Sequence, residues 1–104
     1  MNDEEWEKLT DYVYDNIIVN YQDVEFYEWM PVGYNSNKCK ITLLDNYGGE
    51  QFMEDISNIL NELDEQLPEE IIFSHEISEE VEKNHYGIEV SHTYQCDITL
   101  KEVI

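Results

Sequence analysis

Two histidines and two cysteines are the side chains of this chain best suited to bind a metal ion: His75, His92, Cys39 and Cys96. Imidazole nitrogen and thiolate sulfur are the usual zinc ligands. The spacing of these residues matches no compact zinc signature, so the pattern favours half-buried residues of a sheet face. We therefore expect no metal ion and no other cofactor, and a site built from His75, His92 and Cys96 remains the alternative.

Adjacent carboxylates could in principle perform acid–base catalysis, and the chain holds several such pairs: Glu4–Glu5, Glu54–Asp55, Asp64–Glu65, Glu69–Glu70 and Glu79–Glu80. With 25 acidic residues among 104, such pairs arise from composition alone. The sequence has no P-loop, no HExxH, no nucleophile elbow and no CxxC. The segment DNYGGE at 45–50 lacks the alternating acids of a calcium loop. We expect a protein that is not an enzyme.

The charge balance restricts the kind of partner. The 25 acids face five lysines and no arginine, for a formal net charge of -20. Arginine is the usual fork for phosphate recognition, so direct binding of nucleic acid or of an anionic membrane is not expected. The acidic start MNDEEWEKL is unlike a secretory signal, and no window reaches the roughly 18 apolar residues of a membrane span. With two cysteines only, we expect a cytoplasmic protein with thiols rather than a disulfide.

Two helices and four strands are expected. A helix at about 3–19 begins at Asn2 or Asp3, and its apolar residues recur at helical spacing. The segment 50–67 has the clearest helical stripe, from Phe52 to Leu67, and Pro68 ends it. Alternation predicts strands in DVEFYEWM (23–30), KCKITLLD (38–45), EEIIFSHEISEEVEKN (69–84) and YGIEVSHTYQCDITL (86–100). The order α-β-β-α-β-β indicates one α+β domain over 1–104, with a four-stranded antiparallel sheet and both helices on one face.

The last two strands are expected to form a hairpin. A turn at Lys83–Asn84 predicts Ile77 opposite Val90 and makes His75 and His92 neighbours across the strands, with the apolar faces coinciding. An alternative ends the first of these strands near Ser78. The final 15-residue strand would span ~50 Å, which is longer than usual, so it should bend, bulge or project past the sheet.

Negative charge is unevenly distributed along the chain. Residues 1–30 hold nine acids and one lysine, residues 41–82 hold thirteen acids and no cation, and residues 84–104 hold three acids and one lysine. A step of four residues along a helix rises ~6 Å, and alternate residues of a strand lie ~6.7 Å apart. Both steps resemble the spacing of phosphates along a nucleic-acid strand. A rigid surface with carboxylates at such intervals would attract the basic groove of a nucleic-acid-binding protein.

The candidate partner-binding residues are the acids of the second helix, of the segment after it and of the third strand, with two aromatic anchors: Glu50, Glu54, Glu62, Glu65, Glu69, Glu76, Glu80, Glu82, Tyr27 and Trp29. Exposed tyrosine and tryptophan are typical anchors of interfaces. The competing interpretation is a solvated acidic face that keeps the domain in solution, with the two aromatic residues in the core.

Size, charge and acidic runs such as NELDEQLPEE and EISEEVEK resemble those of small acidic inhibitors from phages and mobile elements. This class includes DNA-mimic anti-restriction proteins, anti-CRISPR proteins and inhibitors of uracil-DNA glycosylase, and immunity proteins against nuclease toxins are similar. The resemblance implies a stoichiometric inhibitor that occupies the nucleic-acid-binding groove of a target protein. One alternative is an immunity protein that neutralises a nuclease toxin. Another is a homodimeric interaction module whose nearly neutral final strand pairs with its copy at the edge of the sheet.

Overall fold

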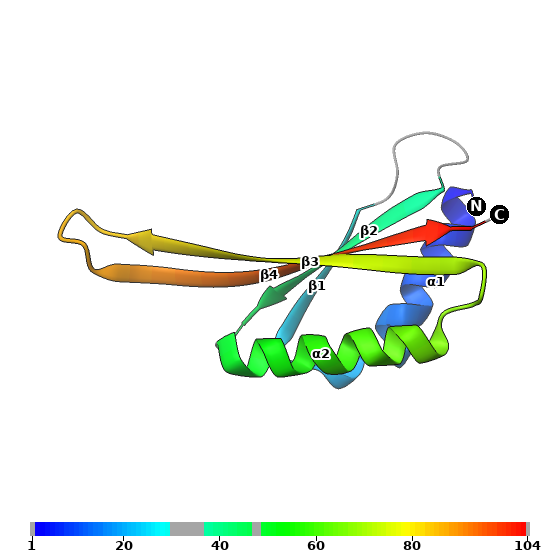
Figure 1. The fold of residues 1–104 in the computed structure, drawn as a ribbon, viewed down its shortest axis with the longest axis horizontal. Coiled ribbons are helices and arrows are strands. Elements are labelled where there is room, and N and C mark those ends of the chain that lie inside the picture. Colours follow the sequence, from blue (N-terminus) through cyan, green and yellow to red (C-terminus); the bar gives the residue numbers. More distant parts are fainter. Residues whose placement is uncertain (1, 30–36, 47–48, 104) are drawn as a thin grey trace.

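The computed structural model describes residues 2–29, 37–46 and 49–103. Its elements are α1 (Asp3–Asn16), the short 3₁₀ turn η1 (Ile18–Asn20), β1 (Val24–Trp29), β2 (Lys38–Asp45), α2 (Gly49–Gln66), β3 (Ile71–Lys83) and β4 (Glu89–Glu102). The strands form one sheet in the order β1-β2-β4-β3, and all neighbouring pairs are antiparallel (Figure 1). The predicted α+β class and the order α-β-β-α-β-β are therefore confirmed.

Helix α1 begins as the sequence indicates. The Asn2 side chain accepts a hydrogen bond from the Glu5 N–H at 2.9 Å, and Asp3, Glu4 and Glu5 lie in the first turn. Side-chain capping and acids near the positive end of the helix dipole both stabilise a helix start. The helix ends at Asn16, short of the predicted 19, because η1 redirects the chain where the consecutive residues Ile17 and Ile18 are both buried.

Helix α2 buries one stripe of side chains, from Phe52 through Ile56 and Ile59 to Leu63. The predicted helix 50–67 is thus present with ends shifted by one residue. The Leu67 N–H still donates to the Leu63 carbonyl at 3.0 Å, and Pro68 then stops the helical pattern.

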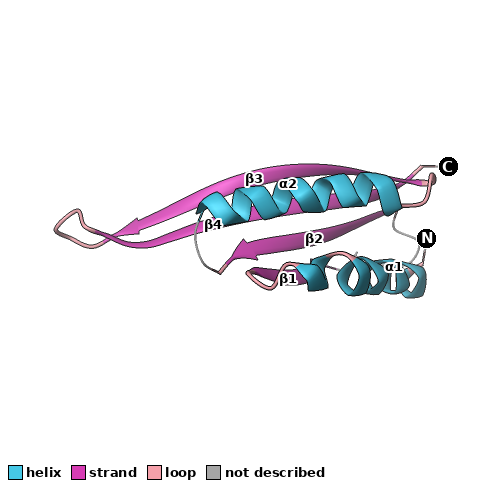
Figure 2. Cartoon of the chain, turned by 90° about the horizontal axis from the view of Figure 1, so that it is seen from below, coloured by secondary structure: helices cyan, strands magenta, loops and turns pink. Residues whose placement is uncertain are grey.

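Both helices cover the same face of the sheet. On β2 the buried residues are Cys39, Ile41 and Leu43, and in β4 they stand opposite Leu100, Ile98 and Cys96. These six side chains form a single core with Trp6 and Val13 of α1 and the α2 stripe. Figure 2 shows both helices on the near side of the strands. In the part of the chain that the structure describes, no helix covers the other side, which we call the open face.

The pairing of β3 with β4 differs from the predicted register. Ile77 stands opposite Cys96 and not Val90, and His75 stands opposite Ile98. The partners are displaced by six residues along β4, an even number, so the apolar faces still coincide and alternation cannot distinguish the two registers. The turn spans Asn84–Ile88 instead of Lys83–Asn84. Strand β3 is continuous through Ser78, so the alternative break there is wrong.

The hairpin β3–β4 continues far beyond the rest of the sheet (Figure 1). Strand β2 pairs with β4 only from Lys101 to Gln95, so among the described residues the segment 89–94 pairs with β3 alone. A bulge leaves Val90 without a partner between the pairs Glu82–Ser91 and Lys83–Glu89. The long final strand therefore both bulges and projects, as its length indicated. We call residues 79–94 the arm, and it contributes to a molecule of 52 × 28 × 18 Å.

Candidate partner-binding surfaces

The outer side of the helices is the most acidic surface of the molecule. Helices α1 and α2 carry twelve of the 25 acidic residues, and Lys8 is the single lysine of the two helices, all of whose residues the structure describes. Because the apolar stripes face the sheet, most of the carboxylates face solvent, although Asp55 is buried and Glu62 is half-buried. Six of the exposed acids lie on the sides of the helices turned away from the sheet: Glu4, Asp11 and Asp15 on α1 and Glu50, Glu54 and Glu65 on α2. We call these six residues the helical acidic surface.

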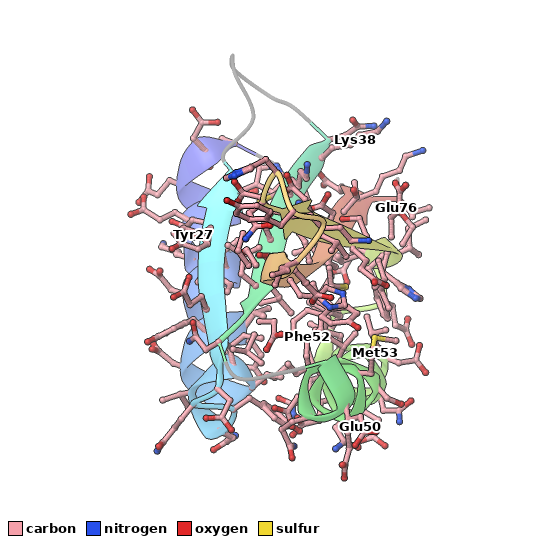
Figure 3. The ribbon with its side chains drawn as sticks, turned by 90° about the vertical axis from the view of Figure 1, so that its left-hand side faces the viewer. Tyr27, Lys38, Glu50, Phe52, Met53 and Glu76 are labelled. Carbon is pink, nitrogen blue, oxygen red and sulfur yellow. The ribbon has the colours of Figure 1, made fainter. Side chains whose placement is uncertain are left out.

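Four of the five predicted residues of α2 and the loop after it are exposed: Glu50, Glu54, Glu65 and Glu69. In Figure 3, Glu50 lies on the side of α2 away from the strands, and Phe52 points toward them. Glu62 is half-buried and accepts a hydrogen bond from the Tyr21 hydroxyl at 2.7 Å. Burial, followed by this hydrogen bond and the Glu62 charge, raises the pKa of Tyr21 to about 12. Glu62 therefore connects α2 to the segment before β1 and is less available to a partner.

The predicted acids of β3 lie on the opposite side of the molecule. Glu76, Glu80 and Glu82 are exposed, and they share the open face with their cross-strand partners Asp97, Thr93 and Ser91. Figure 3 shows Glu76 on the far side of the strands from Glu50. The structure thus separates the predicted acids into two surfaces, one on the helices and one on the open face.

Of the two predicted aromatic anchors, the structure describes one side chain. Tyr27 is 47% exposed and lies on the open face, where it pairs with Thr42. Its hydroxyl donates to Glu25 at 3.0 Å, and this hydrogen bond, with the Glu25 charge, raises the pKa of Tyr27 above its ordinary value. Trp29 ends β1 opposite Lys40, and its side chain lies outside the described residues.

Lysines gather at one end of the open face. Lys38 and Lys101 are cross-strand partners, and Lys40 is the next open-face residue along β2. Beside them, Asp97 accepts hydrogen bonds from Thr42 and Gln95, each at 2.9 Å, and its other oxygen lies 3.5 Å from the Lys40 Nζ. Burial opposes ionisation of Asp97, but these hydrogen bonds and the lysine together lower its pKa. Three of the five lysines therefore lie on the face opposite the helical acidic surface.

The arm presents apolar side chains that nothing in the described chain covers. The exposed fractions are 41% for Val81, 76% for Tyr86, 61% for Ile88 and 60% for Val90. The predicted register placed Val81, Tyr86 and Val90 in a half-buried sheet, so sequence reasoning missed this surface. The available signal was the length of the final strand, which exceeds what two helices of this size can cover.

The predicted neighbours His75 and His92 are far apart. His92 pairs with Val81, and it lies six residues from Ile98, the partner of His75, which corresponds to ~20 Å along the strand. Cys39 stands opposite Leu100, four residues from Cys96, so the two buried thiols are ~13 Å apart and too distant for a disulfide. Across residues 2–29, 37–46 and 49–103, no group of three or more His, Cys, Asp or Glu side chains could hold a metal ion.

The predicted edge position of the final strand is wrong for half of its length. From Gln95 to Lys101 β4 lies between β2 and β3, and the sheet edges are β1 and β3. Among the described residues, only the part of β4 in the arm has an open edge. For the homodimer alternative, the edge of β4 in the arm is therefore the part of this strand that remains open to pairing with a copy.

Comparison with protein-family models, with curated protein sequences and with solved structures finds no match for this chain. Within the described residues, no helix is long and apolar enough to cross a lipid bilayer.

Proposed function

We propose that this protein is a stoichiometric inhibitor that binds the basic, nucleic-acid-binding groove of a target protein. The observation that supports the proposal is the uneven distribution of charge. The helices carry twelve acids and one lysine, whereas the described strands present on the open face three lysines and five acids: Glu25, Glu76, Glu80, Glu82 and Asp97. A scattered distribution would serve solubility equally well. A polarised one gives the molecule a side that a positively charged groove attracts, which accelerates encounter and selects the orientation of binding.

The spacing of the carboxylates supports mimicry of a phosphate backbone. Glu50 and Glu54 are one four-residue step apart, as are Asp11 and Asp15, which is a rise of ~6 Å on each helix. The common core holds both helices in place, and the Tyr21–Glu62 hydrogen bond connects α2 to the segment before β1. Such a preorganised array loses little conformational entropy on binding. The target would be a nuclease or another enzyme of DNA or RNA processing, in the cytoplasm of the host cell for a phage-encoded protein.

The first test is functional. The protein is expressed in bacteria that carry a defined restriction system or a defined CRISPR nuclease, and the efficiency of phage plating is measured. The expected result is restored plating with one of these systems, together with a complex of the purified protein and that nuclease that excess target DNA dissociates. Inhibition of a purified nuclease toxin instead would identify an immunity protein. If no nuclease is inhibited and DNA does not compete for the captured partner, the proposal is wrong.

The second test locates the surface with two variants that remove the same charge. The variant E50Q/E54Q/E65Q changes the helical acidic surface, and E76Q/E80Q/E82Q changes the open face. We expect the first to slow association with the target several-fold at low salt, with a smaller effect at high salt, since the contact is electrostatic. The second removes the same charge from the open face and should slow association less, and a larger effect there would assign the main contact to β3. Labelled DNA and RNA themselves should not bind either variant or the wild type at physiological salt.

A further inference from the structure

The arm exposes an apolar surface on an element that has little other support. The core face of the hairpin continues past the end of β2, where Val81 pairs with His92 on that face. The tip adds Tyr86, Ile88 and Val90, each at least 60% exposed. A two-stranded hairpin is only marginally stable alone in water, and contiguous exposed apolar side chains are typical of interaction sites.

The tip is nevertheless held in one conformation. The Asn84 side-chain oxygen accepts hydrogen bonds from the backbone N–H groups of Tyr86 at 2.9 Å and Ile88 at 3.1 Å. The Asn84 backbone donates to the Ile88 carbonyl at 2.9 Å, and Gly87 supplies the positive φ of 78° that the turn requires. Hydrogen bonds within the turn thus fix the position of the apolar tip.

The paired strands of the arm below the turn, residues 79–83 and 89–94, which we call the shaft, are also held by side-chain contacts. Both ring nitrogens of His92 lie against carboxylates, Nε2 at 2.6 Å from Glu79 and Nδ1 at 3.1 Å from Glu89. The His92 ring stacks on Tyr94 with a centroid distance of 4.6 Å, and the Tyr94 ring lies 6.2 Å from that of Phe52 in α2. This chain of contacts connects the projecting strands to the core.

The charge of the arm indicates its occupant. Acids line the shaft, namely Glu79, Glu80, Glu82 and Glu89, against the single arm lysine Lys83. A second copy would bring one acidic arm against another and one charge of -20 against another. A pocket with an apolar floor would accept the apolar tip of the arm, and a rim of lysine or arginine would face the acids of the shaft.

From these observations we infer that the arm is an anchor that inserts its apolar tip, Tyr86, Ile88 and Val90, into an apolar pocket rimmed by lysine or arginine on the target protein. This inference rests on the proposed function, because it assumes a basic protein as partner. Burial of these side chains would slow dissociation, whereas the acids of the helices and the shaft accelerate association.

The test uses two fluorescent peptides of equal length and charge as probes, one alternating leucine with lysine and one alternating serine with lysine. Binding is measured by fluorescence anisotropy at physiological salt. We expect wild type to bind the leucine–lysine peptide about tenfold more tightly than the serine–lysine peptide. The variant Y86S/I88S/V90S should lose that preference. The control V19S/M53S/I72S replaces three other exposed apolar residues, leaves the charge unchanged and should keep the preference.

The outcomes separate this inference from the function on which it rests. Equal binding of both peptides by wild type, or an unchanged preference in the tip variant, would overturn the anchor and leave electrostatic binding intact. Binding of neither peptide would contradict the proposed function and the anchor together. Sedimentation velocity over about a hundredfold range of concentration should give a monomer. A dimer that the tip variant abolishes would assign the tip to a second copy and overturn the inference. Unchanged circular dichroism and thermal unfolding establish that each variant is folded.

Discussion

Glu62 differs from the other glutamates of α2 because it accepts a hydrogen bond from a half-buried tyrosine. The Tyr21 hydroxyl lies 2.7 Å from its carboxylate, whereas Glu50, Glu54 and Glu65 are exposed. A carboxylate that satisfies a half-buried hydroxyl contributes to folding, so its contribution to binding is small. The sequence placed all of these residues in one acidic set, and only the contact distinguishes them.

Replacement of Tyr21 by Phe should lower the free energy of unfolding by about 1.5 kcal/mol, because it removes one hydrogen bond to a charged acceptor. Urea denaturation measures the change. The control is Tyr12→Phe, since the exposed Tyr12 hydroxyl lies 3.4 Å from Gln66 and its loss should cost about 0.5 kcal/mol or less. Equal losses for the two variants would contradict the structural role of Tyr21.

The two thiols should make stability fall at alkaline pH. Burial raises the pKa of Cys39 and of Cys96 to about 11, so the native protein keeps protons that the unfolded chain releases near the ordinary thiol value. The contribution of the two protonated thiols to the free energy of unfolding is therefore fully present below about pH 8.5, and it is lost as the pH rises toward 11. We expect a loss of about 2 kcal/mol per thiol between pH 8 and 10.5, measured by urea denaturation.

Tyr21 contributes to the same alkaline loss, since its pKa is also raised, to about 12. The double variant Cys39→Ala/Cys96→Ala isolates the thiols. It is less stable at pH 8 because the core loses atoms, but its further loss between pH 8 and 10.5 should be much smaller. A loss as large as that of wild type would mean that the thiols do not cause it.

At the scale of the elements, the hairpin β3–β4 has two different parts. From Ile71 to Ser78 the strand β3 belongs to a covered four-stranded sheet, and beyond that the arm stands alone. Buried contacts are few in the arm, so it should open locally more readily than the core. Its resistance to opening depends on the turn at Asn84 and on the contacts of His92.

Gly87→Ala should loosen the arm without unfolding the domain. No atom lies within 4 Å of a Cβ at this position, so the cost comes from the backbone φ of +78° alone and is about 1 kcal/mol. Hydrogen exchange should become faster at the arm amides of Asn84 and Gly87, which are hydrogen-bonded in the turn. The amides of β2 serve as the internal control. An equal acceleration in β2 would show that the arm and the core open as one unit.

At the scale of the whole molecule, the fold groups part of the acids and part of the lysines that make up the formal charge of -20. Helices on one face of the sheet place their acids together, and the pairing of β2 with β4 places Lys38 beside Lys101. The helical acidic surface repels itself in the native state. This repulsion lowers the stability of the folded state, and the same negative charge would attract the basic groove of the proposed target.

The melting temperature should rise as salt increases from low to moderate concentration. The Debye length falls from ~30 Å at 0.01 M to ~8 Å at 0.15 M, which screens the repulsion between the exposed carboxylates. Calorimetry or circular dichroism at several sodium chloride concentrations measures the effect. The variant E50Q/E54Q/E65Q, with three fewer charges, should show a smaller rise. A flat or falling curve for wild type would contradict a concentrated acidic surface.

The sequence alone determined the elements, the class and the faces. Capping at Asn2, the stripe from Phe52 to Leu63 and strict alternation in the strands are local signals, and the folded chain keeps them. The balance of 25 acids against five lysines was equally readable. These properties depend on residues close together in the chain, where period and propensity are sufficient.

Only the tertiary structure decided which surfaces exist. The register of β3 against β4 is displaced by six residues from the predicted one, and every even displacement preserves the alternating pattern. That register separates His75 from His92 and lets the arm project. The central position of β4 and the separation of Glu50 from Glu76 onto opposite sides follow from how distant segments pair. Pairing over long sequence separations depends on turn geometry and on packing against the helices. The local pattern of apolar and polar residues does not predict either of them.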